Sequence, residues 1–333
     1  MRILYAIQGT GNGHLSRATD ILPQLFKRAE VDILISGIQS EIRLPYHITY
    51  RLHGLSFIFG SRGGIDYLDT FRKNSLNRFL EEVKSLPVKD YDLVINDFEP
   101  VSAWAARWNR VPCYSLSHQA ALLSHQVPKP FMGSPLGQLI LRYYAPADMH
   151  YGFHFQNYDK GITYPSIRPE VRAVEPVDRG FYLVYLPAFD EQRITEVLSM
   201  LPNTHWKVYS KKGKKRYAVG NVDISPVDGK EFTQDLGRCS GVLCGAGFET
   251  PAEAMHLGKK LMVVPMRGQY EQKLNAMALK RIGVPVLKRF DQGAFKAIHE
   301  WVHSGDIIRF EYPEVGKQIV DDILVGFIDR EIA

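Results

Sequence analysis

Short apolar runs alternate with amphipathic stretches along most of the chain, and this alternation constrains the fold more than any other feature. In the first half, the runs 3–7, 31–35 and 93–95 are strand-like, and 16–28 places its apolar residues at helical spacing. Repeats of strand, helix and strand predict a parallel sheet with helices on both faces. Ligands of such sheets gather at the carboxyl ends of the strands.

The alternation breaks between 161 and 176 and then starts again. Pro165, Pro169 and Pro176 interrupt this stretch, which indicates a boundary between domains. We therefore expect an α/β protein with two Rossmann-like doubly wound domains that face each other across a cleft. The expected divisions are an N-terminal domain at 1–165, a C-terminal domain at 177–305, and a helical segment at 306–333 that packs back on the first domain.

The charge and cysteine content exclude several classes of protein. A formal net charge of +5 is compatible with anionic small ligands or acidic lipid. The sequence has no compact basic stripe with interleaved aromatic residues, so we expect no binding to nucleic acid. Cys113, Cys239 and Cys244 form neither a CxxC pair nor a zinc spacing. No stretch approaches the roughly 18 apolar residues of a membrane span. No leader-like segment precedes the first strand, and we expect a cytoplasmic protein.

The first motif is the glycine-rich stretch 9–14, directly after the first apolar run. Gly11 and Gly13 let the backbone approach a ligand closely, and the helix that follows offers N–H groups to a phosphate. The spacing resembles a dinucleotide fingerprint without matching it. His14 ends the loop and is suited to act as a general base. The alternative is that His14 only caps the helix or packs locally.

The second motif, 244–254, again joins an apolar run to a helix. Gly245 and Gly247 would expose helix N–H groups to an anion, and the Thr250 hydroxyl would join them. Glu253 could accept hydrogen bonds from two ribose hydroxyls. The alternative is a capping box, because Thr250 and Glu253 have the required spacing.

The third motif covers 265–276, where a strand ends and a polar loop leads into a helix. Glu271 and Gln272 lie near the helix start, and carboxylate and amide groups suit vicinal sugar hydroxyls. On the alternative view they are ordinary exposed residues.

Polar residues also follow two further strands. Asp97 and Glu99 come after the run at 93–95, and either could take a proton or orient His14. His118 follows the next strand in the same way. Solvent exposure is the simpler alternative for Glu99.

Taken together, these motifs resemble a GT-B glycosyltransferase related to families 1 and 28, a group that includes the lipid-linked N-acetylglucosaminyltransferase of peptidoglycan synthesis. The donor motif of that group reads G-x-x-[ST]-x-x-E, followed by a Pro-ended strand and [DE]-Q-x-x-N-A. The residues at these places are Gly247, Thr250, Glu253, Gly258, Pro265, Glu271, Gln272, Asn275 and Ala276. A closer likeness is to a bacterial and archaeal branch carrying G-x-G-H, D-F-E-P and G-x-x-E-Q.

The resemblance implies a donor that is a nucleotide-diphosphate sugar, expected to be UDP-linked. The implied donor-binding residues are Gly11, Gly13, Gly245, Gly247, Phe248, Thr250, Glu253, Arg267, Glu271, Gln272 and Asn275. Glu253 would hold the ribose, and 247–250 would meet the diphosphate. Glu271 and Gln272 would meet the transferred sugar. Gly245 replaces a histidine that binds phosphate in plant-type members, so Arg267 is expected to assist there.

On the acceptor side, the resemblance makes His14 the base, with Asp97 as its acidic partner, and places Glu99 and His118 near the acceptor. The expected reaction needs no metal and no cofactor beyond the donor itself. The acceptor is expected to be lipid-linked or a polysaccharide of the cell envelope. Such an acceptor implies peripheral contact with the inner face of the membrane.

Two other functions fit the same plan. One is a nucleotide-sugar 2-epimerase, which would convert the donor without an acceptor. The other is a nucleotide-sugar-binding protein without catalytic activity. An oxidoreductase fits less well, because no acidic residue ends a clear strand about 20 residues past the first glycines.

Overall fold

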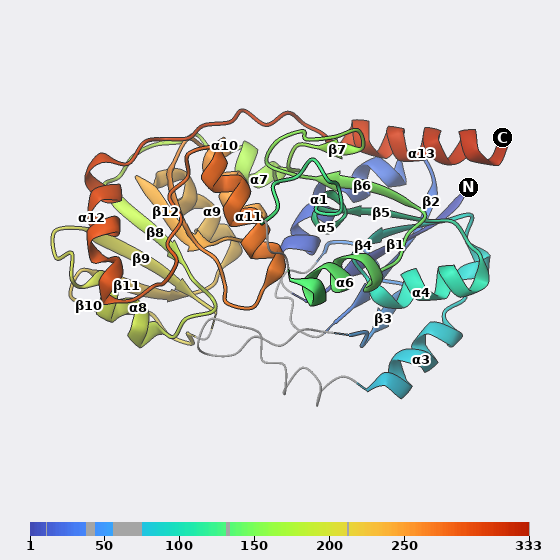
Figure 1. Cartoon of the computed structure of the whole chain (residues 1–333), viewed down its shortest axis with the longest axis horizontal. Coiled ribbons are helices and arrows are strands. Elements are labelled where there is room, and N and C mark those ends of the chain that lie inside the picture. Colours follow the sequence, from blue (N-terminus) through green and yellow to red (C-terminus); the bar gives the residue numbers. More distant parts are fainter. Residues whose placement is uncertain (11, 38–43, 56–74, 131–133, 212, 333) are drawn as a thin grey trace. The chain divides into compact units, whose positions relative to one another are not determined.

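The computed structural model describes residues 1–332 except 11, 38–43, 56–74, 131–133 and 212 (Figure 1). The described chain divides into two compact units. The first holds the residues up to Arg168 together with those from Pro313 onward, and the second holds Pro169–Tyr312. The first unit therefore begins and ends the chain.

Within its described residues, the first unit contains a seven-stranded sheet whose pairs are all parallel. In sheet order the strands are β3 (Tyr50–Leu52), β2 (Glu30–Ser36), β1 (Arg2–Gln8), β4 (Leu93–Asp97), β5 (Cys113–Ser117), β6 (Met149–Phe153) and β7 (Ile162–Thr163). The helices are α1 (Gly13–Phe26), α3 (Leu76–Ser85), α4 (Pro100–Asn109), α5 (His118–Ala121), α6 (Pro135–Tyr143) and α13 (Gly316–Ile332), with a 3₁₀ turn η1 (Val88–Asp90).

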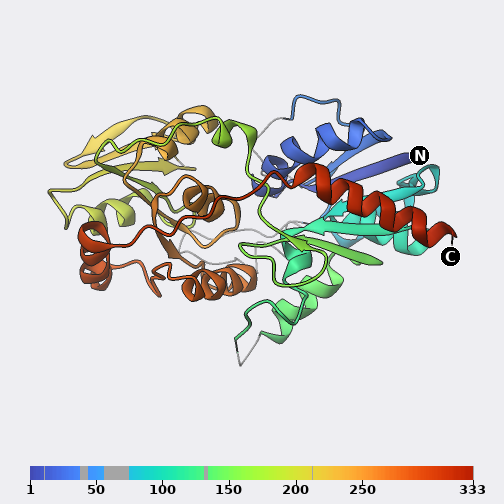
Figure 2. The ribbon, with the colours of Figure 1, turned by 90° about the horizontal axis from the view of Figure 1, so that it is seen from above.

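Both faces of this sheet are covered. Leu4 and Ala6 of β1 belong to an apolar core shared with α3 and α4. On α1, the buried Ala18, Ile21 and Leu25 recur at helical spacing, as the sequence predicted. Helix α13 contacts α1 and lies along the first unit (Figure 2).

Within its described residues, the second unit contains a six-stranded sheet that is parallel except for the β10–β11 pair. In sheet order the strands are β10 (Tyr217–Val219), β11 (Val222–Pro226), β9 (His205–Ser210), β8 (Phe181–Tyr185), β12 (Gly241–Gly245) and β13 (Lys260–Val264). The helices are α7 (Pro169–Arg172), α8 (Glu191–Leu198), α9 (Gly229–Arg238), α10 (Glu249–His256), α11 (Tyr270–Arg281) and α12 (Phe295–Ser304), with a 3₁₀ turn η2 (Gln292–Ala294).

The second unit has its own apolar core. Trp206 of β9, Leu198 of α8 and Trp301 of α12 are buried together there. This core fixes β8, β12 and β13 side by side, and their carboxyl ends meet at one edge of the sheet. Among the described residues, no helix is both long and apolar enough to cross a bilayer.

Candidate active site

One group of predicted residues comes together where β1 and β4 end. His14 lies in the first turn of α1, and its Nδ1 is 2.8 Å from Oδ1 of Asp97, the last residue of β4. Because β1 and β4 are neighbouring parallel strands, the loops that follow them share one edge of the sheet. Asp97 is fully buried and stands in the position expected for the acidic partner of His14.

Arg17 completes this cluster, and the sequence interpretation missed it. Its Nη1 donates to both oxygens of Asp97, at 2.8 and 2.9 Å. Its guanidinium carbon also lies 5.2 Å from the ring centre of Phe153. Arg17 is three residues beyond His14, so both side chains leave the same face of α1. A charged residue among the apolar positions of a helix was the available signal, because buried charges are normally paired.

The cluster fixes the orientation of the His14 ring. A carboxylate can only accept a hydrogen bond, so Nδ1 carries the proton in the contact with Asp97. In the neutral ring, Nε2 on the opposite edge is then the basic nitrogen. About 12% of the His14 side chain is exposed. This arrangement can take up a proton at Nε2, and Asp97 stabilises the imidazolium that results.

The glycine at the start of this loop is required by close packing. The backbone N–H of Gly9 donates to the carbonyl of Ser36 at 2.6 Å. A Cβ at position 9 would come within 2.9 Å of both that oxygen and the Ile35 side chain. Gly13 is the first residue of α1, and Gly11 lies outside the described residues.

Glu99 has a structural explanation. Phe98 adopts a left-handed φ of 56°, which turns the chain sharply after β4. The Glu99 carboxylate then caps α4, accepting hydrogen bonds from the N–H groups of Val101 at 2.8 Å and Ser102 at 2.6 Å. Ser36 Oγ donates a third. Glu99 is fully buried, so the exposed alternative is wrong, while its acceptor-side role stays a prediction.

His118 is also fully buried. Its Nδ1 lies 2.8 Å from the carbonyl oxygen of Phe153, which ties the start of α5 to β6. Its ring lies 5.3 Å from that of His154. Burial lowers the pKa of His154 well below its usual value, with His118 adding to the effect. The acceptor-side role of His118 stays a prediction.

The second group of predicted residues surrounds the glycine loop between β12 and α10. A Cβ at Gly247 would meet no atom within 4 Å, so open space lies beside the backbone there. Asn275 of α11 donates to the carbonyl of Ala246 at 3.1 Å. Gln272 Oε1 accepts from the N–H of Met266 at 2.9 Å and would lie 3.7 Å from a Cβ at Gly245. Both α11 side chains therefore hold the loops around the opening.

The start of α10 differs from the prediction. The helix begins at Glu249, its N-cap is Phe248, and no side chain caps it. Thr250 lies inside the first turn, so the capping box of Thr250 with Glu253 is wrong. Glu253 is buried, with 3% of its surface exposed. On α11, Gln272 is buried, which excludes the view that it is an ordinary exposed residue.

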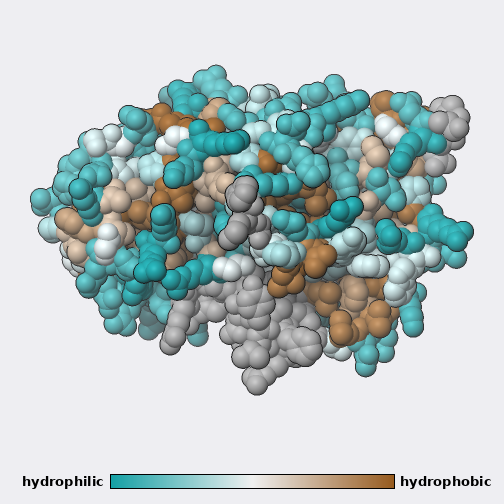
Figure 3. Space-filling model, in the orientation of Figure 1, coloured by the Kyte–Doolittle hydropathy of each residue, from teal (hydrophilic) through white to brown (hydrophobic). Residues whose placement is uncertain are grey.

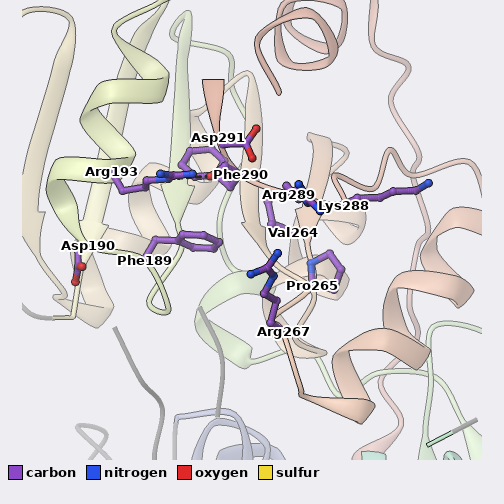
Figure 4. A pocket seen from close by; sticks show the side chains of 10 residues that line it. All are labelled: Phe189, Asp190, Arg193, Val264, Pro265, Arg267, Lys288, Arg289, Phe290 and Asp291. Atoms are coloured by element: carbon purple, nitrogen blue, oxygen red, sulfur yellow. Dashed lines mark hydrogen bonds between the residues drawn. The ribbon is translucent and has the colours of Figure 1, made fainter. Parts of the chain in front are cut away.

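Arg267 lines a hollow of about 390 Å³ at the carboxyl ends of β8 and β13 (Figure 4). The other residues that line it are Phe189, Asp190, Arg193, Val264, Pro265, Lys288, Arg289, Phe290 and Asp291. Of the charged residues that line this hollow, the sequence predicted a binding role only for Arg267. The signal it passed over was the basic pair beside an aromatic residue at 288–290.

The fold is similar to that of several solved proteins. The spinosyn forosaminyltransferase SpnP matches with a TM-score of 0.58 and 15% identity, over 98% of this chain and 99% of that chain. MurG of Acinetobacter baumannii matches with a TM-score of 0.58 and 14% identity, over 97% and 99%. MnaA of S. aureus, in a co-structure with UDP, matches with a TM-score of 0.61 and 10% identity, over 98% of this chain and 97% of that chain. At these identities the likeness shows the fold alone, which is GT-B.

None of the curated proteins matches the chain. Residues 1–303 match the family described as glycosyl transferase family 1. The match begins with β1, runs through both glycine loops and α11, and ends within α12. The chain is therefore a glycosyltransferase and belongs to glycosyl transferase family 1.

Proposed function

We propose that the protein transfers a sugar from a UDP-linked donor to an acceptor hydroxyl, without a metal ion. The observation that carries the proposal is the 2.8 Å contact between His14 and the buried Asp97. In this reaction His14 removes the proton from the acceptor hydroxyl. The acceptor oxygen then bonds to the anomeric carbon as the bond from that carbon to the diphosphate oxygen breaks. The expected product has inverted configuration.

The donor would bind to the second unit at the glycine loop. Backbone N–H groups from Gly247 to Thr250 lie at the start of α10, where the helix dipole favours the departing diphosphate. This stabilisation replaces the role that a cation plays in other transferases. Glu253 would hold the ribose hydroxyls. Glu271 and Gln272 would contact the transferred sugar from α11.

The acceptor would be a lipid-linked or polysaccharide precursor of the cell envelope, used at the inner face of the membrane. Helix α6 supports this proposal. Its Leu136, Leu139 and Tyr143 are 55%, 54% and 53% exposed and recur at helical spacing, while Leu141 faces the interior. Apolar side chains are visible on the surface of the first unit (Figure 3). An exposed apolar stripe of this kind suits the surface of a bilayer.

The apolar stretch that begins at Leu122 could form either an acceptor- or membrane-facing loop or part of the core. Leu122 and Val127 are buried, which places them in the core. Phe131 and Met132 lie outside the described residues.

Steady-state UDP release from a panel of UDP-sugars, with membrane and polysaccharide fractions as acceptors, tests the proposal. For an active pair, His14→Ala and Asp97→Asn should each lower kcat by about 100-fold or more, because general base catalysis typically contributes that much. Formation of an epimer without any acceptor would indicate the 2-epimerase instead. Donor binding without turnover across the panel would indicate a binding protein.

A further inference from the structure

The hollow beside Arg267 carries more positive charge than a neutral sugar requires. Arg193, Arg267, Lys288 and Arg289 line it, against two carboxylates. In the described part of the chain, Arg267, Lys288 and Arg289 form no ion pair. The carboxylate of Asp291 is engaged at the start of η2, where it accepts from the N–H of Gly293. Cations gathered without partners repel one another, so an anion that enters the hollow is favoured.

The walls of the hollow combine this charge with an apolar surface. The rings of Phe189 and Phe290 meet edge to face with centroids 5.4 Å apart. Arg193 Nε donates to the carbonyl of Phe290 at 3.1 Å, which holds one guanidinium against this wall (Figure 4). Aromatic walls exclude water and strengthen the attraction between guanidinium groups and an anion.

The hollow adjoins the proposed donor loop. It lies at the ends of β8 and β13, the strands on either side of β12, which carries the loop. Gln272 links the two places, because it accepts from Met266, the neighbour of Arg267, and lies beside Gly245. If Gln272 contacts the transferred sugar, as proposed above, the sugar end of the donor lies close to the hollow.

We propose that the transferred sugar carries a carboxylate and that the hollow, through Arg267 and Arg289, binds it. The donor class would then be a nucleotide-activated uronic acid. The inference rests on the proposed function, because it needs the diphosphate to bind at the glycine loop. Guanidinium groups present paired donors that match a carboxylate, whereas a neutral hexose offers no charge to pair with them.

Isothermal titration with UDP, UDP-glucose and UDP-glucuronic acid tests this inference. Wild-type protein should bind UDP-glucuronic acid about tenfold or more tightly than UDP-glucose, the affinity expected from a charge-assisted pair. Arg267→Gln and Arg289→Gln should each reduce that preference, and Arg289→Gln should leave UDP affinity unchanged. Arg281→Gln, an exposed α11 residue outside the hollow, is the charge-matched control.

Equal affinity for both sugars, unchanged in the variants, would overturn the inference and leave the proposed function standing. Weaker UDP binding in Arg289→Gln would also overturn it, because the hollow would then hold the diphosphate. If none of the three ligands bound, the proposed function and the inference would both fail.

Discussion

A single carboxylate, Asp97, holds two side chains of α1 in place. Arg17 neutralises it from one side, and His14 contacts it from the other. Removing its charge by Asp97→Asn leaves a buried guanidinium without its anion, so the variant also loses stability. Turnover and stability should be measured on the same preparations, because the catalytic effect counts only in folded protein.

A second carboxylate, Asp32 of β2, gives a prediction on acid stability. Partial burial raises its pKa, but hydrogen bonds from Tyr91, Thr49 and Arg2 outweigh this and lower it below the usual value. The unfolded chain therefore binds the proton more readily, and the stabilisation exists above about pH 4 and fades as the pH falls through the lowered pKa.

Asp32→Asn should accordingly be less stable than wild type by about 1 kcal/mol at neutral pH, the typical net worth of such hydrogen bonds. Urea unfolding at pH 7 and at pH 3 measures the difference. The difference in free energy of unfolding between wild type and Asp32→Asn should be smaller at pH 3 than at pH 7. A larger difference at pH 3 would contradict a lowered pKa for Asp32.

At the scale of elements, α11 supports the glycine loop through Asn275. Asn275→Ala removes the hydrogen bond to Ala246 and leaves a buried carbonyl without that donor, which should cost about 1–3 kcal/mol of stability. The looser loop should also bind UDP about tenfold more weakly. Lys273→Ala, at an exposed position of the same helix, is the control for both measurements.

Helix α6 carries the prediction on membrane contact. The double change Leu136→Ser with Leu139→Ser should reduce co-sedimentation with anionic phospholipid vesicles, while the unfolding midpoint stays near wild type because both side chains are exposed. The control is Leu76→Ser with Leu80→Ser, which removes two exposed leucines from α3 instead. If both pairs reduced sedimentation equally, α6 would have no special role.

Strands that the sequence predicted well are those with uninterrupted apolar runs, such as β1 and β4. Both faces of these strands are buried, which gives them continuous apolar runs instead of an alternating pattern. Short edge strands such as β3 and β7 escaped notice because three or two residues leave no pattern. The pairing of Arg17 with Asp97, 80 residues apart, could not be predicted from local spacing. The hollow is lined by residues of three separate segments of the chain, so local spacing could not predict it either.

At the scale of the whole molecule, the first unit depends on the last helix. Ile319, Val320 and Ile323 of α13 are buried. Each fully buried side chain of this type contributes about 1.5–3 kcal/mol, so the helix supplies a large share of a domain's usual stability of about 5–15 kcal/mol.

A chain that ends at Tyr312 should therefore unfold its first unit at much lower urea, while the second unit, with its own core, keeps its transition. Circular dichroism measured at increasing urea concentration follows the unfolding transitions of both units. Val325→Ser with Ile328→Ser changes only exposed positions of α13 and should leave the first transition in place. Loss of both transitions together on truncation would show that the units do not fold independently.

The most direct test of the proposed donor site is the affinity for UDP of wild type, Glu253→Ala and His14→Ala, measured by titration calorimetry. Glu253→Ala should bind UDP about tenfold more weakly, because a carboxylate that accepted hydrogen bonds from two ribose hydroxyls would contribute about that much. His14→Ala should bind UDP as wild type does. Wild-type affinity in Glu253→Ala would contradict the placement of the donor on the β12–α10 loop.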